Sequence, residues 1–425
     1  MRRNVVAPAF AVSLLLAAIP GGVGAQDAQK PQVLVWTDSV RQPGFEAYRD
    51  LVKDTVDVKV EIIDISQLLG KIQLANAAGS GWPDVVFAQP GNLALLASPE
   101  IAYTAPLTAE LVGQDFLDGF GNANSWCVID GTTYCLKNDL AQSVLWYDKT
   151  TIDTLGLKVP TTMNEWAATA MQLKDAGYVS GAIGDQNFYA SYLWPSGCPM
   201  AQVVSSTEVR INSQDPKCTR VAELIQPLVE AGALDTRSSF DAGFLSEVAQ
   251  QGKVAMTFGP SWFGDFVIKP EASWAVPAGR ITAAPMPIWE GDDVAHSGEW
   301  GGGIFAISTH AAFPQAAADA IKWMVSDPEH VKGGPTFPAY GPANEIWTTR
   351  VATDPYYAAD PAAAMTVQSQ LINPSVGPVR MDVDAQIGST LALPITQGSS
   401  IQDSIDQFNE GLANLAPSAG YTVSQ

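Results

Sequence analysis

The chain has 425 residues, of which 47% are hydrophobic and 16% are charged, and its formal net charge is −21. This length exceeds one ordinary hydrophobic core and favours two lobes, while the composition excludes a largely disordered protein. The acidic balance argues against nucleic acid and anionic lipid, because both partners need basic patches.

The first 25 residues have the pattern of a secretory signal peptide. Arg2 and Arg3 form a short positive start, an apolar run covers 9–19, and small residues lead to a predicted cleavage after Ala25. The apolar run is too short to span a membrane. General and twin-arginine export both stay open. No cysteine follows the predicted cleavage site, so we expect no lipid anchor.

Strand and helix signals then alternate, which predicts an α/β fold. In the helix of segment 160–177, Thr162 and Glu165 fit a capping box and Gly177 fits a stop signal. Pro314 suits the first turn of another helix, which should end before Pro328. We expect short strands at 33–35, 58–64, 85–88, 254–258 and 304–307, and helices within 44–55, 66–81, 160–177, 313–329 and 400–415.

Four cysteines in an exported chain favour two disulfides, for which three pairings are possible. We expect sequential pairing, Cys127 with Cys135 and Cys198 with Cys218. The first pair flanks a predicted hairpin. A two-residue Asp130-Gly131 turn would place Cys127 opposite Tyr134, so the disulfide predicts a three-residue turn over 130–132 instead. A zinc site is the rival explanation, but no C-x-x-C pair is present.

Aromatic, carboxylate and amide residues follow several predicted strands. Ligands of open α/β sheets bind beyond the carboxyl ends of the strands, so these residues are candidates for a binding site. Their chemistry suits a neutral sugar, whose C–H face can stack on an indole while its hydroxyls bond to carboxylates. The candidates are Trp36, Asp38, Gln89, Asn138, Asp139, Trp194, Trp262, Glu299, Trp300 and Gly302.

Each candidate also has a purely structural interpretation. A loop tryptophan such as Trp194 is often part of the core, and Trp36 and Trp262 stand between the two interpretations. The carboxylates Asp38, Asp139 and Glu299 could equally be helix caps or solvated loop residues. The sugar interpretation would fail if Trp36 and Trp262 were both sealed inside separate hydrophobic interiors, with no shared opening between them.

Motifs of common enzymes are missing. The segment "GPSWFG" is one residue too long for the nucleophile elbow of serine hydrolases, and "GGGIFA" precedes a strand where a dinucleotide site needs a helix. The segment "MDVDAQIG" lacks the spacing of a calcium loop. We therefore expect no enzyme, cofactor or metal, although a glycosidase with two spatially paired carboxylates stays open.

Five segments, in order, resemble family 1 extracellular solute-binding proteins, the maltose-binding-protein-like sugar receptors of ABC importers. They are "KIQLANAAGSGWPDVVF", "GTTYCLKNDLAQSVLWYDK", "PTTMNEWAATAMQLKDAG", "GKVAMTFGPSW" and "WGGGIFAISTHAAFPQAAADAIKWMVSDPE". The chain departs from the family pattern in its cysteines and in Leu136-Lys137, where the family often has Leu-Pro.

The resemblance implies a two-lobe periplasmic-binding-protein fold with hinge segments and a central ligand cleft. One lobe would hold 31–138 and 284–330, and the other 139–283 and 331–425. Matching positions place Trp262 most firmly in the cleft, together with most of the other candidates, whereas Trp194 depends only on its aromatic loop context. The expected partners are a carbohydrate and the membrane permease subunits of an ABC importer, and the expected state is a periplasmic monomer.

The sequence thus predicts a non-catalytic receptor that captures a mono- or oligosaccharide. A receptor for a polyamine or another cationic solute is the first alternative, because carboxylates and aromatic rings also bind amines. A secreted glycosidase is the second.

Overall fold

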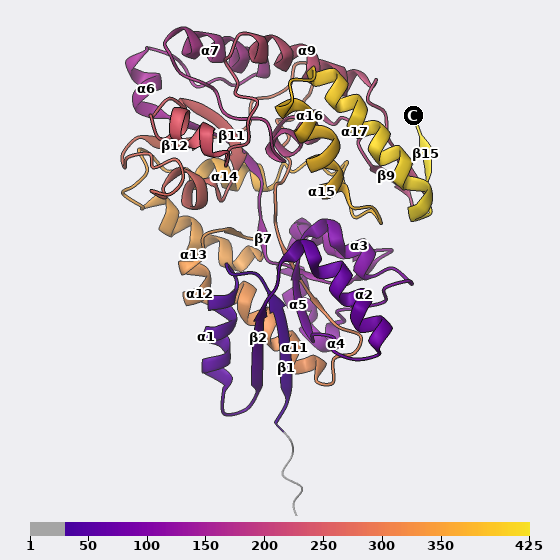
Figure 1. Cartoon of the computed structure of the whole chain (residues 1–425). Coiled ribbons are helices and arrows are strands. Elements are labelled where there is room, and N and C mark those ends of the chain that lie inside the picture. The colour runs from indigo at the N-terminus through magenta and orange to yellow at the C-terminus, as the bar shows by residue number, and fades with distance from the viewer. Residues whose placement is uncertain (1–29) are drawn as a thin grey trace, which may run out of the picture.

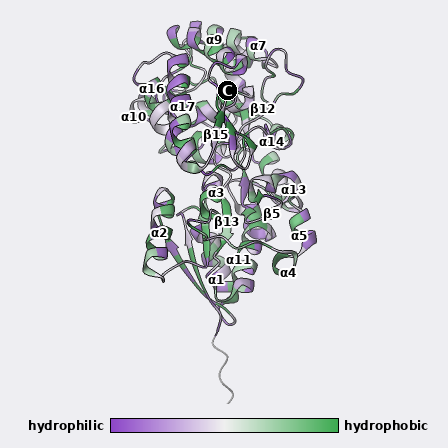
Figure 2. Cartoon of the chain, turned by 90° about the vertical axis from the view of Figure 1, so that its right-hand side faces the viewer, coloured by the Kyte–Doolittle hydropathy of each residue, from purple (hydrophilic) through white to green (hydrophobic). Residues whose placement is uncertain are grey.

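The computed structural model describes residues 30–425 and shows two α/β bodies joined at a narrow waist (Figure 1). The view at right angles shows the same two bodies one above the other, with β13 inside the lower one (Figure 2). The two-lobe α/β fold predicted from the sequence is confirmed. The predicted signal peptide lies outside the described residues. Within 30–425, no helix is both long and apolar enough to cross a membrane.

The first lobe is built on a five-stranded sheet whose central strands are buried on both faces. β1 pairs in parallel with β2 and β3, whereas β13 runs antiparallel to β3 and β6. The sheet order is β2 (Asp57–Ile62), β1 (Gln32–Thr37), β3 (Val85–Ala88), β13 (Ile304–Ile307) and β6 (Leu136–Lys137).

Alternation along the strands sends neighbouring residues to two separate cores, so the lobe has three layers. Val85 and Phe87 of β3 face the core under α1 (Gln42–Val52) and α11 (Pro314–Ser326), and Val86 faces the core under α2 (Leu68–Ala78). Further helices of this lobe are α3 (Leu93–Leu96), α4 (Ala109–Val112), α5 (Gln114–Asp118) and α12 (Pro328–Gly333).

The second lobe centres on the antiparallel order β11 (Met256–Pro260), β8 (Ser143–Asp148) and β12 (Ile281–Ala284). A smaller sheet, β15 (Thr422–Ser424), β10 (Glu208–Arg210) and β9 (Gln202–Ser205), lies at its edge. The helices are α6 (Lys149–Thr154), α7 (Met163–Asp175), α8 (Trp194–Ser196), α9 (Pro216–Glu230), α10 (Ala242–Phe244), α14 (Ala362–Ser369), α15 (Val383–Gln386), α16 (Leu393–Thr396) and α17 (Ile401–Leu415), with α13 (Gly341–Ala352) near the waist.

Most predicted elements are present. The capping box of Thr162 and Glu165 opens α7, Pro314 opens α11, and β3 and β13 have the predicted bounds. β11 begins two residues later than predicted and includes Pro260. An edge strand tolerates this proline, because the missing N–H need not enter the ladder. The preceding Val254 instead bridges to Val179.

Three segments lie side by side at the waist. β7 (Asp139–Leu140) pairs with β14 (Phe337–Pro338), and Gln142 bridges to Glu299 in the segment that leads into β13. The chain therefore passes between the lobes around β7. The lobe boundaries themselves stay predictions. The boundary after residue 330 falls inside α12, and the one after residue 283 falls inside β12.

The two predicted disulfides are confirmed, with Cα–Cα distances of 4.9 Å for Cys127–Cys135 and 4.6 Å for Cys198–Cys218. They use all four cysteines, which removes the zinc alternative. The predicted three-residue turn is wrong. β4 (Val128–Ile129) pairs with β5 (Thr132–Thr133) around a two-residue turn, in which Asp130 and Gly131 have φ of 48° and 79°.

The bridge forms despite this turn because the strand pair ends before the cysteines. The N–H of Tyr134 donates to the carbonyl of Cys127, and Cys127 is already the last residue of the 3₁₀ segment Gly121–Cys127. The cysteines therefore lie diagonally at the open end of the hairpin, where ladder register no longer sets the direction of their side chains.

Replacing Cys198 and Cys218 by serine should lower the free energy of unfolding by about 3 kcal/mol, because this bridge closes a loop of about 20 residues in the unfolded chain. The Cys127/Cys135 double variant is the matched control and should lose less, since its loop is shorter. Denaturant unfolding of both variants measures the difference. An equal or smaller loss for the longer loop would contradict the loop-entropy explanation.

Candidate functional site

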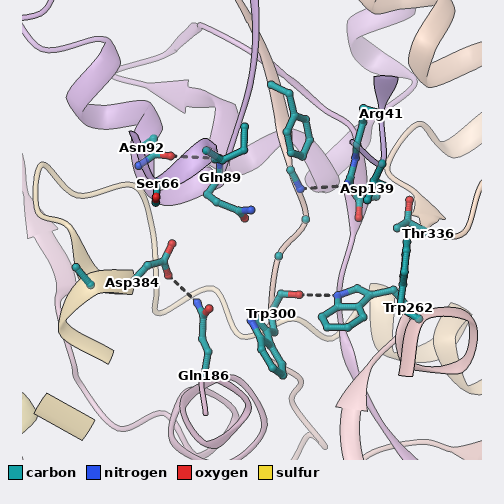
Figure 3. Close-up of a pocket in the computed structure, with 18 of the residues that line it drawn as sticks. Arg41, Ser66, Gln89, Asn92, Asp139, Gln186, Trp262, Trp300, Thr336 and Asp384 are labelled. Carbon is teal, nitrogen blue, oxygen red and sulfur yellow. Dashed lines mark hydrogen bonds and ion pairs between the residues drawn. The ribbon is translucent and has the colours of Figure 1, made fainter. Parts of the chain in front are cut away.

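A cavity of about 710 Å³ lies between the two lobes. Its lining comes from ten separate stretches of the chain, which the fold brings together across the waist. Figure 3 shows Ser66, Gln89 and Asn92 on one side of this space and Gln186 and Asp384 on the other. The volume is in the range of small-molecule sites, and both lobes contribute to it.

Four aromatic rings form an apolar wall on one side of the cavity. Trp262 follows β11, and its ring lies 5.3 Å from that of Trp300 at an interplanar angle of 65°. The indole N–H of Trp262 donates to the carbonyl of Trp300 at 2.8 Å (Figure 3), which fixes the pair. Phe240 and Phe266 flank the two indoles and are 47% and 38% exposed. Aromatic surface of this size left open to solvent in a cleft is typical of a ligand platform.

The glycines 301–303 allow the chain to pass between this wall and the first lobe. A Cβ on Gly303 would lie 2.1 Å from Cε2 of Phe87, and one on Gly302 would lie 3.0 Å from Oε1 of Glu299. Gly301 and Gly302 also have φ of 100° and 78°, a conformation that residues with a Cβ rarely adopt. The run of three glycines therefore has a steric reason at each position.

A buried ion pair holds the same segment from behind. Nζ of Lys137 lies 2.7 Å from a carboxylate oxygen of Glu299, and both side chains are at most 3% exposed. The other carboxylate oxygen accepts the N–H of Ala141 at 3.1 Å. A buried carboxylate needs such partners, and Glu299 finds them on a segment that crosses between the lobes.

Asp139 is a second carboxylate whose oxygen is already occupied. Its Oδ1 accepts from Asn138 at 2.6 Å, from Arg41 at 3.1 Å and from the N–H of Gly303 at 3.1 Å. Arg41 also pairs with Asp38 and lies 4.3 Å above the ring of Phe87. Asp139 therefore positions Arg41 and the glycine segment at the wall of the cavity.

The opposite wall carries carboxylates that no basic side chain neutralises in the contacts of the described residues. Asp384 accepts from Nε2 of Gln186 at 2.6 Å (Figure 3), and Asp382 caps α15 through the N–H of Ala385. Asp384 is open to solvent in the cleft, but protein surrounds its carboxylate. This loss of hydration is the largest cause that raises its pKa to about 6; repulsion from Asp382 adds to the rise, and the Gln186 hydrogen bond opposes it.

A smaller chamber of about 60 Å³ continues from the main cavity. The two spaces share Gln89, Gln186, Gly301 and Asp384 in their walls. The chamber is mostly apolar and carries the rings of Trp126, Tyr189 and Trp194. It is named the side chamber below.

A third hollow, of about 940 Å³, lies at the waist and is named the rear hollow. Lys137, Leu140 and Glu299 face it, whereas their neighbours Asp139 and Trp300 face the main cavity. Because side chains alternate along an extended chain, the rear hollow lies on the other side of the crossing segments. The main cavity is the candidate site, because the paired indoles and the polar groups of both lobes line it.

Five predicted site residues line the main cavity: Gln89, Asp139, Trp262, Trp300 and Gly302. Trp194 and Glu299 line the side chamber. Trp194 was expected in a loop, but it opens α8, is 5% exposed, and donates its indole N–H to the carbonyl of Asn373 at 2.8 Å. Asn138 lies at the edge of a minor hollow, and its amide bonds to Asp139.

Trp36 and Asp38 lie elsewhere. β1 runs on to Thr37, so Trp36 is a strand residue on the sheet face under α2, and its indole N–H donates to Glu61 at 3.0 Å. It shares no opening with Trp262, so the expectation that both indoles face one cleft is wrong. Asp38 accepts the N–H of Arg41 at 2.8 Å and pairs with its guanidinium, which is the structural role of a turn carboxylate.

Sequence reasoning missed several residues of the cavity wall. Arg41 was not predicted because a neutral sugar suggests carboxylates and indoles rather than a cation, although Arg41 lies only six residues after the predicted strand 33–35. Asp382 and Asp384 belong to the segment "MDVDAQIG", which was considered only as a calcium loop. Three segments with π-helical turns also reach the site, and no periodicity marks them; they are Tyr189–Leu193, Gly264–Ile268 and Ile387–Ala392.

The family of bacterial extracellular solute-binding proteins matches residues 36–330 of the chain. The protein belongs to this family. It is thus a solute-binding protein that works outside the cytoplasm, and the resemblance noted in the sequence is confirmed. A comparison with curated proteins found no match.

Many solved structures share the fold. The galacto-N-biose/lacto-N-biose I-binding protein of an ABC transporter from Bifidobacterium longum has a TM-score of 0.77 at 15% identity, covering 94% of this chain and 100% of that chain. A binding protein from B. animalis subsp. lactis, in complex with β-1,6-galactobiose, gives 0.74 at 20% identity, covering 93% and 100%. The acarbose-binding GacH receptor of Streptomyces glaucescens gives 0.70 at 19% identity, covering 92% and 100%.

The Asp384→Asn variant should be more stable than the parent protein at pH 7 and equally stable near pH 3. The folded state raises the pKa of Asp384 from 3.8 to about 6, so between these values it binds more protons than the unfolded chain. Its contribution to stability therefore falls as pH rises through this window, and the variant escapes that loss.

Thermal unfolding across this pH range measures the effect, with the surface variant Asp54→Asn as the control. A variant that gains nothing at pH 7, or that gains equally at pH 3, would contradict the raised pKa.

Proposed function

We propose that this solute-binding protein captures a neutral mono- or oligosaccharide in the main cavity and delivers it, without chemical change, to the permease subunits of an ABC importer. The observation that carries the proposal is the indole pair of Trp262 and Trp300, open to a cavity whose remaining walls are rich in hydroxyl, amide and carboxylate groups. A sugar ring needs both surfaces, an apolar one for its C–H face and hydrogen-bonding groups for its rim.

The solute would be held by both lobes at once. Ser66, Gln89 and Asn92 face it from the first lobe, and Gln186, Thr336 and Asp384 from later segments of the chain (Figure 3). Open and closed arrangements of the lobes then differ in affinity, because only the closed one brings both walls onto the ligand. Binding shifts the population towards closure, and the closed form is what a permease would recognise. We propose that the protein acts as a periplasmic monomer in this role.

The hydrogen bonds and the ion pair of the waist carboxylates fit binding better than hydrolysis. The two waist carboxylates, Glu299 and Asp139, already accept hydrogen bonds from protein groups, and Glu299 is in an ion pair. A glycosidase needs a carboxylic acid and a second carboxylate on either side of the scissile bond. Asp382 and Asp384, which have no basic partner among the contacts of the described residues, both lie on one short segment of one wall.

A cationic solute is the second candidate, because Asp382 and Asp384 have no basic partner among the contacts of the described residues. An amine could pair with these carboxylates and stack on the aromatic wall through cation–π contacts. The two candidates differ in ionic strength dependence, since an ion pair in a solvent-open cleft weakens with added salt.

A thermal-shift panel of neutral mono- and disaccharides against polyamines distinguishes the candidates. We expect a saccharide to raise the melting temperature, as any ligand of the folded state does, with little effect of salt up to 0.5 M. Stabilisation by an amine should weaken over the same range, because the Debye length falls to about 5 Å and screens its ion pairs. Stabilisation by amines alone would replace the sugar proposal. Release of product from chromogenic glycosides would show a hydrolase.

Trp262→Ala should weaken binding of the stabilising saccharide by about 1–3 kcal/mol, the scale of an aromatic hot spot. Trp36→Phe is the matched control. Because Trp36 lies outside the cavity, this variant should bind the saccharide with the affinity of the parent protein, within error. Isothermal titration calorimetry gives both values. Unchanged affinity in Trp262→Ala, or an equal loss in Trp36→Phe, would contradict the placement of the sugar on the aromatic wall.

A further inference from the structure

Trp126 belongs to one lobe by its backbone and to the other by its side chain. It is the next-to-last residue of the 3₁₀ segment Gly121–Cys127, and the following Cys127 is buried in the first-lobe core under α2. The indole of Trp126, however, packs against the second-lobe core formed by α7, α9 and α17. The chain crosses the waist only later, around β7, so this indole is a contact between the lobes.

Trp194 is the partner of Trp126 in the second lobe. The two ring centroids lie 5.8 Å apart at an interplanar angle of 50°. Trp194 is fixed to its own lobe, because its indole N–H donates to the carbonyl of Asn373 at 2.8 Å. It is also packed tightly against the chain, since a Cβ on Gly298 would lie 3.0 Å from Cβ and Cγ of Trp194. The packing of Trp126 on Trp194 is named the interlobe contact below.

The backbone that carries Trp126 is equally fixed to the first lobe. Cys127 is bonded to Cys135, and the side-chain amide of Asn124 donates to the carbonyl of Cys135 at 3.2 Å. The N–H of Lys137 donates to Oδ1 of Asn124 at 2.9 Å, which ties the segment to β6 at the edge of the first-lobe sheet. Because each ring is held by its own lobe, the interlobe contact forms when the lobes approach and is lost when they separate.

The side chamber has walls from both lobes. Residues 89–91 contribute from the first lobe, and Val383, Asp384 and Ile387 contribute from the second. The two sides approach closely, since a Cβ on Gly91 would lie 3.5 Å from Oδ2 of Asp384. Trp126 and Trp194 lie in this wall from opposite lobes. Widening the chamber would therefore part the two rings and expose apolar surface to water, which costs free energy.

Trp126 is not among the residues that line the main cavity. It faces the side chamber on one side and the rear hollow on the other. A saccharide that stacks on Trp262 or Trp300 would therefore have its ring away from Trp126. A role of Trp126 in binding that saccharide would act through the arrangement of the lobes.

We propose that Trp126 is a positioning residue for closure: the interlobe contact stabilises the closed arrangement and so sets the affinity for the saccharide. This rests on the proposed function, in which only the closed arrangement holds the ligand from both sides. The apparent affinity of such a receptor falls with the fraction of the protein that is closed. Removal of the indole takes its packing from the closed arrangement alone, because the open one has already lost it.

Calorimetry on Trp126→Ala tests the proposal, with the saccharides of the thermal-shift panel as probes. We expect the Kd to rise about three- to thirtyfold, the effect of one lost aromatic contact, while the stoichiometry stays unchanged. The factor should be the same for every saccharide that binds the parent protein, because the interlobe contact is the same in each complex. Trp126→Phe keeps an aromatic ring at this position and should lose less affinity than Trp126→Ala.

Trp82→Ala is the matched control. Trp82 packs against the same core as Cys127, but it stacks on His310 and precedes β3, at the end of that strand opposite to Gln89. The control should have a lower melting temperature and an unchanged affinity.

Unchanged or tighter binding by Trp126→Ala overturns the proposal, and so does an equal loss of affinity in Trp82→Ala. A loss confined to one saccharide also overturns it, because it would show that Trp126 contacts that ligand directly. If no saccharide of the panel binds the parent protein, the proposed function fails instead.

Discussion

The arrangement of the site depends on one constraint, the way in which segment 299–303 crosses between the lobes. The buried ion pair of Lys137 and Glu299 fixes the start of the segment, and the N–H of Gly303 on Asp139 fixes its end. Between these anchors, the carbonyl of Trp300 accepts the indole N–H of Trp262. The aromatic wall is therefore attached to the waist itself, and any change in the angle between the lobes acts on it directly.

The absence of side chains on 301–303 is the second half of this constraint. Phe87 from the first lobe occupies the space in which a Cβ of Gly303 would lie, and Arg41 stacks on that same ring while it bonds to Asp139. The two lobes thus meet through packed rings and shared hydrogen bonds, and a few polar groups remain open to the cavity. Such a site is preorganised on its waist side, and the outer wall with Gln186 and Asp384 supplies the contacts that depend on the ligand.

Local signals predicted the elements and part of the site. The capping box at Thr162, the proline at α11 and the apolar strands of the first lobe depend on neighbouring residues, so the sequence shows them directly. Trp262, Trp300 and Asp139 were found because each follows or precedes a buried strand. Trp36 was misplaced by the same rule, because its strand continues to Thr37 and pairs with β2, which turns the indole to the sheet face under α2.

The rest of the site could not be read in this way. Arg41, Gln186 and Asp384 are separated by long stretches of chain, and only the complete fold brings them to one cavity. The hairpin turn shows the same limit at short range: the cysteine pairing was right, but the turn was inferred from ladder geometry that ends before the cysteines.

The most direct test of the central claim is a crystal structure with the saccharide that most raises the melting temperature. We predict one ligand between the lobes, stacked on Trp262 or Trp300 and bonded to residues of both sides; a ligand in the rear hollow or on the outer surface would contradict it.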